Sequence, residues 1–213
     1  MRKCITIVAG ALLCAMVAAA QDLPRYETFL GYTYVRVNSA TDVPAFSANG
    51  GSGQFAYNFN KWISGVVDVG AVHNGNINGF HLDSTLTNFL AGPRVAYRKS
   101  SRITPYIQVL FGGVYAATST RIDLTDAIAV PPIFIPGAGN LVQATSARIS
   151  TSQTAFAMTA GGGLDIKINK HVSFRPIGLD YYMTRLQNLR TFDDNNQHNL
   201  RYTTGFNFTL GAQ

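Results

Sequence analysis

The stretch Asn49–Gly75, NGGSGQFAYNFNKWISGVVDVGAVHNG, decides the fold because its side chains change character at every second residue. Before Asn60-Lys61-Trp62 large aromatic residues alternate with small or polar ones, and after it the alternation resumes with aliphatic residues. A period of two in both halves predicts two β-strands joined by a hairpin turn. The aromatic and aliphatic face is formed by Phe55, Tyr57, Phe59, Ile63, Gly65, Val67 and Val69.

The length of this turn determines which residues face each other. A two-residue turn would place Asp68 on the aromatic face. A three-residue loop at Asn60–Trp62 instead pairs Phe55 with Val67. It also pairs Gln54 with Asp68 on the polar face. Because a shift of one residue moves a whole strand to the other face, we predict the three-residue loop.

The N-terminal segment has the pattern of a secretory signal peptide. Arg2 and Lys3 form its charged start, an apolar run follows, and Ala18-Ala19-Ala20 supplies a small-residue cleavage site. We therefore expect a signal peptide over residues 1–20 and a single domain over residues 21–213.

The composition excludes several classes of protein. Charged residues make up 13% of the chain, against roughly 25% in typical soluble domains. The formal net charge is +6 without a basic run, so nucleic-acid binding has no support. Cys4 and Cys14 both lie in the signal peptide, so the exported chain is not a disulfide scaffold. After that segment no apolar run reaches the ~18 residues of a spanning helix, and a strand-rich, charge-poor, exported chain predicts a transmembrane β-barrel.

The alternation along the rest of the chain predicts an all-β fold, an eight-stranded antiparallel up-and-down transmembrane β-barrel. Long and short connections alternate, as they do in barrels with long outer loops and short periplasmic turns, and both chain ends are expected on the periplasmic side. The strands expected besides the hairpin are Tyr26–Val37, Thr85–Arg98, Ile103–Ala116, Ala155–Ile168, Val172–Thr184 and Asn199–Gly211. The outer loops expected between them are residues 38–49, 73–84, 117–154 and 185–198.

Ionised residues on the polar faces are expected inside the barrel, where they need partners because an unpaired buried charge is costly. Asn169-Lys170-His171 resembles the first turn, and a three-residue loop there puts Asp165 opposite Arg175. We therefore predict an Asp165–Arg175 pair in the lumen. The whole predicted lumen network is Glu27, Asp68, Arg94, Asp165, Arg175 and Arg201.

Two positions disturb the regular alternation. Arg175 and Asp180 are five residues apart, so strict alternation cannot direct both inward. Either a bulge near Pro176–Gly178 resets the phase, or Asp180 lies above the membrane. Pro93 has no N–H for the ladder, so a bulge or a local irregularity is expected there.

Aromatic residues gather near both ends of the predicted strands, as rings do at membrane interfaces. The predicted aromatic girdle is Tyr32, Tyr34, Phe59, Trp62, Tyr97 and Phe174.

Several strand motifs resemble those of the small outer-membrane β-barrel superfamily, of the OmpA transmembrane-domain and OmpX type. These motifs are Leu30-Gly31-Tyr32, the GGSGQFAYNFNKW hairpin, Leu90-Ala91-Gly92-Pro93-Arg94, Gly161-Gly162-Gly163-Leu164-Asp165 and Asp180-Tyr181-Tyr182. The resemblance implies a location in the outer membrane of a Gram-negative-type envelope. It also implies contact with outer-membrane lipid and lipopolysaccharide, and with the barrel-assembly machinery.

Three motifs with chemical potential are weighed against plainer interpretations. His171-Val172-Ser173 is similar to the His-x-Ser pair of lipid A deacylase barrels, but it lies at a periplasmic turn, far from outer-leaflet lipid. His73, His81 and Asp83 are a thin set of metal ligands on a loop. Asp193–Asn196 resembles part of a calcium loop, but it lacks the turn glycine and the terminal glutamate. We expect none of them to be catalytic or metal-binding, and we expect no cofactor.

The predicted function is a non-enzymatic outer-membrane barrel that serves envelope structure or surface interaction through its long extracellular loops. The extracellular partner is not specified by the sequence. A lipid A-modifying barrel enzyme and a narrow solute channel are the alternatives, and a soluble lipocalin-like binder would need the opposite orientation of the two faces.

Overall fold

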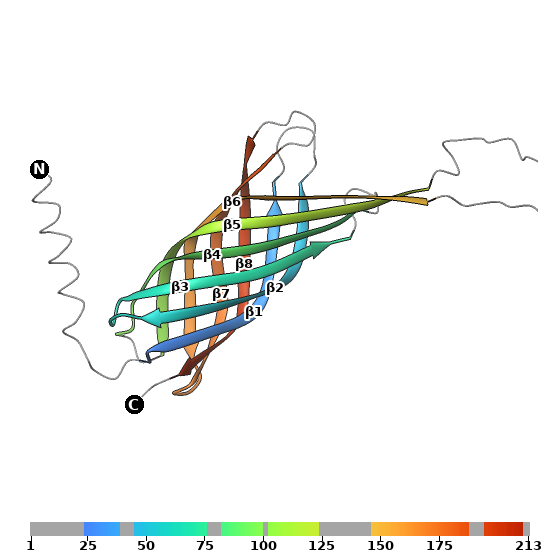
Figure 1. Cartoon of the computed structure of the whole chain (residues 1–213). Helices are drawn as coiled ribbons and strands as arrows, with labels where there is room; N and C mark the ends of the chain where they lie inside the picture. The colour runs from blue at the N-terminus through green and yellow to red at the C-terminus, as the bar shows by residue number, and fades with distance from the viewer. Residues whose placement is uncertain are drawn as a thin grey trace, which may run out of the picture.

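The computed structural model describes residues 24–38, 45–75, 82–99, 102–123, 146–187 and 194–210. Each strand pairs antiparallel with the next, and β1 also pairs with β8, so the sheet closes into a barrel (Figure 1). The eight strands are β1 (Tyr26–Val37), β2 (Phe46–Asn58), β3 (Ile63–Asn74), β4 (Leu82–Ala96), β5 (Ile103–Asp123), β6 (Ser146–Lys167), β7 (Val172–Gln187) and β8 (Asp194–Leu210). The predicted fold class is confirmed. Within the described residues, no helix has the length and apolar character needed to cross a membrane.

The β2–β3 hairpin has the register predicted from the three-residue loop. Phe55 lies opposite Val67, and Gln54 lies opposite Asp68. The predicted signal peptide lies outside the described residues, but β1 and β8 begin and end together, since Tyr26 pairs with Leu210. Both chain ends of the barrel are therefore at the end that carries the short turns, which we call the turn end; the opposite end is the loop end.

Asparagine builds two of the short turns in the same way. In the first, Asn60 Oδ1 accepts hydrogen bonds from the backbone N–H groups of Trp62 and Ile63, both at 2.8 Å. In the second, Asn169 Oδ1 accepts from the N–H groups of His171 and Val172, also at 2.8 Å. These side chains satisfy donors that the strand ladder leaves open, and they hold each turn at the length that fixes the register.

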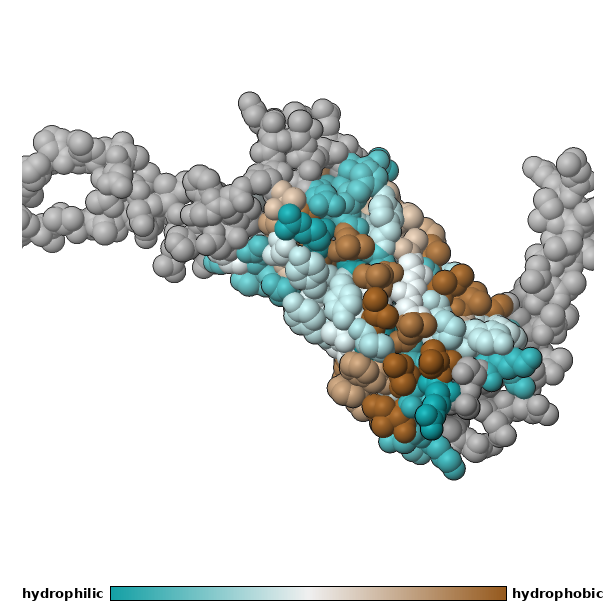
Figure 2. Space-filling view, turned by 180° about the vertical axis from the view of Figure 1, so that it is seen from behind, coloured by the Kyte–Doolittle hydropathy of each residue, from teal (hydrophilic) through white to brown (hydrophobic). Residues whose placement is uncertain are grey.

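The two faces of the sheet differ in polarity as expected for a barrel that is immersed in lipid. Phe55 on the outer face is 47% exposed, whereas Asp68 on the inner face is fully buried. Figure 2 shows hydrophobic side chains spread across the wall between hydrophilic regions toward its two ends. A soluble barrel with an apolar interior would have the opposite arrangement, so the lipocalin-like alternative is wrong. The outward set includes Leu30, Val69, Phe89, Ile107, Phe111, Phe156, Ile166, Leu179, Leu200, Phe206 and Phe208.

β7 contains the bulge that was predicted near Pro176–Gly178. The register of β7 against β8 shifts between Arg175 and Gly178, and the register of β6 against β7 shifts between Leu164 and Ile166. The inserted residue resets the inward phase, so Arg175 and Asp180 are both buried inside the barrel. The alternative placement of Asp180 above the membrane is therefore wrong.

The expected disturbance at Pro93 takes the form of a local interruption. β4 pairs with β5 at Ala91–Phe111 and again at Arg94–Gln108, with the same register on both sides and no pairing of Gly92 or Pro93 in between. On the other side Pro93 pairs with Gly65 of β3. A proline has no N–H to donate, so one ladder loses bonds while the strand count stays unchanged.

Several strands extend further toward the loop end than the sequence predicted. Residues 117–123 and 146–154 were expected in a loop but belong to β5 and β6, and the residues between them lie outside the described part of the chain. β7 and β8 likewise include residues 185–187 and 194–198. β2, β3 and β4 include 46–49, 73–74 and 82–84. Alternation of apolar residues ends where lipid ends, whereas the backbone ladder continues in polar sequence, and this is why the pattern underestimated the strands.

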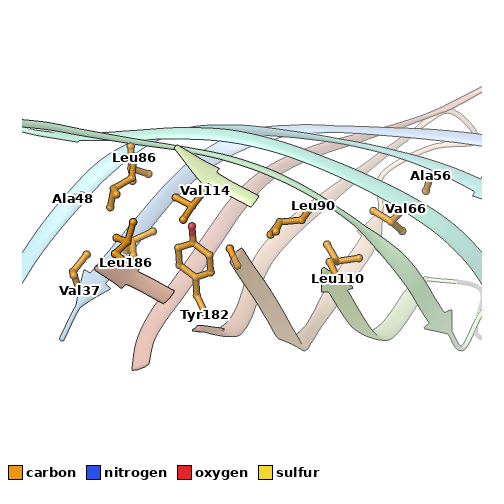
Figure 3. Packing of buried hydrophobic residues seen from close by; sticks show 13 residues of the cluster. Val37, Ala48, Ala56, Val66, Leu86, Leu90, Leu110, Val114, Tyr182 and Leu186 are labelled. Carbon is orange, nitrogen blue, oxygen red and sulfur yellow. The ribbon is translucent and has the colours of Figure 1, made fainter. Parts of the chain in front are cut away.

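The barrel interior contains an apolar part and a polar part. Small and aliphatic side chains fill much of the space toward the loop end, as Figure 3 shows for Val37, Ala48, Leu86 and Leu186. Val66 and Ala56 extend the same cluster toward the turn end. An eight-stranded barrel is just wide enough for such side chains to fill it.

Gly161 offers a test of how closely the wall packs around the bulge. It lies opposite Asp180, and an added Cβ would overlap the carbonyl oxygen of Leu179 and the Cα of Asp180. We expect Gly161→Ala to lower the free energy of unfolding by about 2 kcal/mol, because backbone atoms cannot move aside easily. Gly113→Ala is the matched control, since its added Cβ would meet only the Ala155 carbonyl oxygen at 3.5 Å. Urea titration in detergent micelles measures both, and equal stability of the two variants would contradict the close packing.

Candidate functional site

Ionisable side chains gather inside the barrel, on the face opposite the apolar exterior. Period-two alternation directs most of them inward, and the bulge in β7 adds one more. The buried charged residues are Glu27, Asp68, Arg94, Asp165, Arg175, Asp180 and Arg201, and Arg98 reaches the same space from the turn after β4. We call this set, with the amides that bridge it, the lumen network.

Arg201 of β8 joins acidic residues from two other strands. Its Nη1 lies 3.0 Å from Asp68 Oδ1, and its Nη2 lies 2.8 Å from Asp180 Oδ2. Its Nε also donates to Asp180 Oδ2 at 3.1 Å. This guanidinium therefore ties β3, β7 and β8 together across the lumen, with charge-assisted bonds on both of its sides.

Arg175 makes the second ion pair, with Asp165 of β6. The Nε–Oδ1 distance is 2.7 Å and the Nη2–Oδ2 distance is 3.2 Å, so the contact is bidentate. The guanidinium carbon lies 4.2 Å from the Phe29 ring centre and 4.4 Å from that of Tyr106. Two aromatic faces thus cover the parts of the cation that the carboxylate does not reach.

Arg94 is held by amides and an aromatic ring. Its Nε and Nη2 donate to Gln108 Oε1 at 3.2 and 2.8 Å, and Nη2 also donates to Gln54 Oε1. Its guanidinium carbon lies 4.5 Å from the Tyr106 ring centre. Among the described residues, no carboxylate lies within ion-pairing distance of Arg94.

Amide side chains connect these arginine sites into one network. Gln54 accepts from Arg175 Nη1 at 2.9 Å and donates to Asp68 Oδ2 at 2.8 Å. Gln108 donates to Asp180 Oδ1 at 3.2 Å, and Asn88 donates to Asp68 Oδ1 at 2.6 Å. A glutamine side chain has an acceptor oxygen and a donor NH₂ group, so a single glutamine can hydrogen-bond a guanidinium and a carboxylate at the same time.

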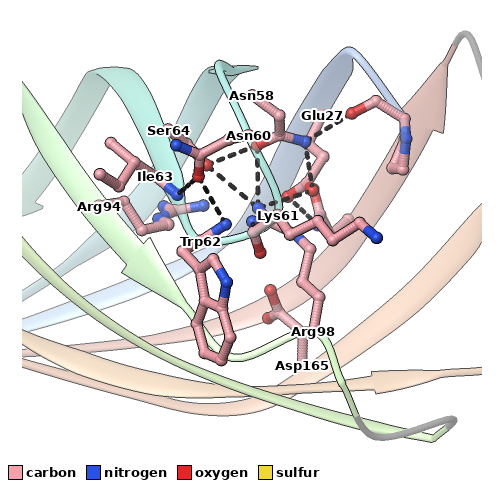
Figure 4. Close-up of polar contacts among 12 residues, drawn as sticks. Glu27, Asn58, Asn60, Lys61, Trp62, Ile63, Ser64, Arg94, Arg98 and Asp165 are labelled. Atoms are coloured by element: carbon pink, nitrogen blue, oxygen red, sulfur yellow. Dashed lines mark hydrogen bonds and ion pairs between the residues drawn. The ribbon is translucent and has the colours of Figure 1, made fainter. Parts of the chain in front are cut away.

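A second cluster closes the turn end of the lumen (Figure 4). Arg98 Nη2 lies 3.1 Å from Glu27 Oε1, and it donates to Asn58 Oδ1 at 2.9 Å and Ser64 Oγ at 3.1 Å. Asn58 Nδ2 donates to Glu27 Oε1 at 2.8 Å, and Asn207 Nδ2 donates to Glu27 Oε2 at 3.2 Å. The carboxylate is therefore surrounded by donors from β2, β8 and the β4–β5 turn.

The structure places all six residues of the predicted lumen set inside the barrel, but it pairs them unevenly. Asp165 contacts Arg175, and Asp68 contacts Arg201. The ion-pair partner of Glu27 is Arg98, the last residue of the expected strand Thr85–Arg98, which the predicted network did not include. The sequence did contain a signal for Arg98. It lies four residues after Arg94, so in an alternating strand both side chains point to the same inward face. Gln108 and Tyr106 were missed because neutral side chains carry no charge signal, and Gln54 was predicted opposite Asp68 but not as a link to Arg94 and Arg175.

The six girdle residues lie at the two ends of the wall. Tyr32, Phe59, Trp62 and Tyr97 are exposed, whereas Tyr34 and Phe174 are half-buried. The Trp62 and Tyr97 rings are 5.2 Å apart at the turn end, and the Phe174 ring lies 5.4 Å from that of Phe206. Toward the loop end, the Tyr32 hydroxyl donates to Asn49 Oδ1 at 2.6 Å. Their role as an interfacial belt stays a prediction.

The described residues of the three motifs weighed from the sequence are not members of the lumen network. His171 is exposed at the β6–β7 turn, next to the buried Ser173. His73 Nδ1 lies 3.1 Å from Thr85 Oγ1, and Asp83 is exposed. His81 and part of Asp193–Asn196 lie outside the described residues. Within the described part of the chain, no group of three or more His, Cys, Asp or Glu is placed to hold a metal ion.

The lumen network consists of polar groups that bind one another and hold the strands together. Its guanidinium groups and carboxylates are engaged with one another or with amides, so the strands are cross-linked through their interior. A few buried polar atoms lack a partner among the described residues: Thr104 Oγ1, Thr159 Oγ1, Tyr182 Oη and Asn207 Oδ1. Thr159 and Tyr182 are ladder partners on β6 and β7, whereas Thr104 and Asn207 lie on β5 and β8.

A closed barrel with an apolar exterior and a charge-paired interior defines a small outer-membrane barrel protein. A family model described as "Outer membrane protein beta-barrel domain" matches residues 5–213, and the chain belongs to this family. It is thus an outer-membrane protein of a Gram-negative-type envelope, surrounded by outer-membrane lipid and lipopolysaccharide.

Solved structures of other outer-membrane barrels are similar to this fold. Ail, the attachment invasion locus protein of Yersinia pestis, is 15% identical, with a TM-score of 0.51 over 86% of this chain and 97% of that one. Neisserial surface protein A (NspA) is 11% identical, with a TM-score of 0.58 over 87% of this chain and 97% of that one. No curated protein matches the sequence.

The Asp165–Arg175 pair can be tested by removing one partner or both. We expect Asp165→Ala to lower the free energy of unfolding by about 3 kcal/mol or more, because Arg175 would remain buried without its carboxylate. The double variant Asp165→Ala, Arg175→Met should recover much of the loss, since it removes the unpaired charge. Lys170→Ala, at an exposed turn residue, is the control. Urea titration checks all three, and a double variant less stable than Asp165→Ala would refute this account.

Proposed function

We propose that this protein is a non-enzymatic, non-conducting membrane anchor that presents its β5–β6 hairpin for interaction outside the cell. The observation that carries the proposal is the length of this hairpin. β5 and β6 pair with each other as far as Asp123 and Ser146, whereas β6 pairs with β7 only from Ala157 toward the turn end. Figure 1 shows the hairpin extending well past the rest of the wall at the loop end.

The pairing pattern gives the hairpin an edge suited to recognition. Beyond Ala157, β6 has β5 as its ladder partner among the described strands, and its other edge does not continue the wall. An edge of this kind can bind an extended segment of another protein through main-chain hydrogen bonds. Ail, whose name describes attachment and invasion, has a barrel of similar fold, which supports an anchor-and-display role for such barrels.

The filled interior of the barrel supports the proposal that the protein does not conduct ions. The lumen network crosses the barrel from β2 to β7 and from β3 to β8, and the apolar cluster fills the space toward the loop end. A conducting pore needs a continuous aqueous gap, and the lumen network and the apolar cluster both obstruct such a gap. The lipid A-modifying alternative would require a catalytic cluster at the loop end, whereas the His171-x-Ser173 pair lies at the turn end.

The absence of conduction can be measured in planar bilayers. We expect protein purified from outer membranes to give no stable current steps, because charged pairs and aliphatic side chains fill the lumen. A wide porin reconstituted in the same bilayers is the positive control. Reproducible steps that grow with salt concentration would replace this part of the proposal with the channel alternative.

The role of the hairpin can be tested with two shortened forms. The first joins Asp123 to Ser146 through Asn-Gly, and the second joins Ala117 to Ser152 through the same turn; each joins residues that face each other in the ladder. We expect the second form to lose adherence to a monolayer of cultured epithelial cells while it still folds and reaches the surface.

Surface antibody labelling and the heat-dependent gel shift of folded barrels are the controls for both forms. Loss of adherence in the first form as well would assign binding to the connecting residues rather than to the strands. Full adherence of both forms would refute a role for the hairpin.

A further inference from the structure

A hollow of about 630 Å³ lies near the loop end, lined for the most part by residues of the outer face. This size is within the range of small-ligand sites. The hollow crosses β3, β4, β5 and β6, so it is formed by the wall itself and the base of the projecting hairpin. Its lining residues are His73, Asp83, Thr85, Tyr115, Ala117, Thr118, Ser119, Ser150, Thr151 and Ser152.

The strand register explains why these side chains meet. One row runs across the sheet from His73 to Thr85 and on to Ala117, which faces Ser152. The next row runs from Asp83 through Ser119 to Ser150. The positions in these two rows have outward parity, because the alternating positions Leu86 and Val114 are buried inside the barrel. Thr118 and Thr151 are ladder partners of the opposite parity, and Thr118 Oγ1 lies 3.4 Å from Oγ of the buried Ser84.

The hollow begins where the apolar wall ends. On the same outward face, Phe89 and Phe156 lie on the side of Tyr115 nearer the turn end, and both are exposed to the surroundings of the barrel. Tyr115 itself is 44% exposed, and beyond it the lining is polar apart from Ala117. An aromatic ring at such a boundary marks the level at which acyl chains give way to polar headgroups.

The lining groups suit a ligand that is rich in hydroxyls. Asp83 is acceptor-only when ionised, whereas the serine and threonine hydroxyls both donate and accept. An added Cβ at Gly75 would lie 3.5 Å from Asp83 Oδ1 and 3.6 Å from His73 Nε2, so these two polar atoms converge beside one point of the backbone. The Tyr115 ring offers an apolar face next to them.

The charge of the lining favours a neutral ligand over a phosphate. Among the described lining residues, Asp83 carries the one full charge and none is a lysine or an arginine. Arg121 and Arg148 are ladder partners one row further from the membrane than Ser119 and Ser150. A phosphate in the hollow would lie against a carboxylate, whereas a pair of sugar hydroxyls would donate to it.

We propose that this hollow binds the neutral sugars of the glycolipid that forms the outer leaflet around the barrel. The hollow lies directly above the apolar wall, and this position indicates a ligand at the level of the headgroups. Asp83, Tyr115 and the hydroxyl groups indicate the chemistry of that ligand. Such a site would fix a lipopolysaccharide molecule against the base of the β5–β6 hairpin. This role is separate from binding of an extracellular partner by the hairpin.

The test compares lipopolysaccharide that has a complete sugar core with lipid A alone. Protein is reconstituted in vesicles of phosphatidylcholine with either glycolipid, and thermal unfolding is followed by the gel shift. A ligand that binds only the folded state raises the unfolding temperature. We expect complete lipopolysaccharide to raise it more than lipid A does.

Two variants of the hollow and one control make the result specific. Tyr115→Ala and Asp83→Ala should each weaken the core-dependent stabilisation by about tenfold in apparent affinity, through the lost ring face and the lost acceptor. Tyr32→Ala is the control, because Tyr32 is a similarly exposed tyrosine near the loop end but does not line the hollow. Tyr115→Ala and Asp83→Ala should both keep the stabilisation that lipid A gives.

Three outcomes would overturn the proposal. Equal stabilisation by lipid A and complete lipopolysaccharide would show that core sugars are not recognised. Loss of the core effect in Arg121→Ala, Arg148→Ala but not in Tyr115→Ala would assign the binding to phosphate groups. Equal binding of released core oligosaccharide to protein in detergent would make a soluble glycan, rather than the surrounding leaflet, the ligand.

Discussion

An ionised side chain enclosed in so narrow a barrel must find its counter-charge or its hydrogen-bond partners on other strands, since neither lipid nor bulk water is within reach. Arg201 meets this condition through Asp68 and Asp180, and Arg175 meets it through Asp165. Each contact also selects one register, because a slip of one residue would turn the charge into the lipid. The lumen network therefore specifies which strands pair and where, whatever its net effect on stability.

The bulge in β7 follows from the same condition. Arg175 pairs with Asp165 of β6 and Asp180 pairs with Arg201 of β8, yet Arg175 and Asp180 are an odd number of residues apart. One extra residue between them lets both face inward, at the expense of ladder bonds around Pro176, which has no N–H to contribute. The freed carbonyls are not all lost: the Tyr202 hydroxyl donates to the Pro176 carbonyl, and the Thr204 hydroxyl to that of Arg175.

Sequence reasoning succeeded where lipid imposes a pattern and failed where lipid is absent. The register of the first hairpin followed from Gln54 and Asp68, because only one turn length kept Asp68 off the apolar face. The outer parts of β5 and β6 gave no such signal, since both faces of a strand beyond the membrane meet water. Arg98 was missed although its parity matches that of Arg94: it lies two residues past the end of β4, and its side chain is long enough to reach Glu27 from there.

The division between a satisfied interior and an extended rim explains where function can reside in such a barrel. Side chains that are committed to one another inside the wall have little freedom to bind anything else, and they make the wall a rigid base. Strands that continue past the membrane need no hydrophobic core of their own, because the ladder that begins in the wall holds them in register. Their sequence is then free to carry polar groups such as those of Ser150 and Ser152. The proposals made above therefore locate specificity on the outer surface near the loop end, at the hairpin and at the hollow beneath it, and give the lumen network a structural role.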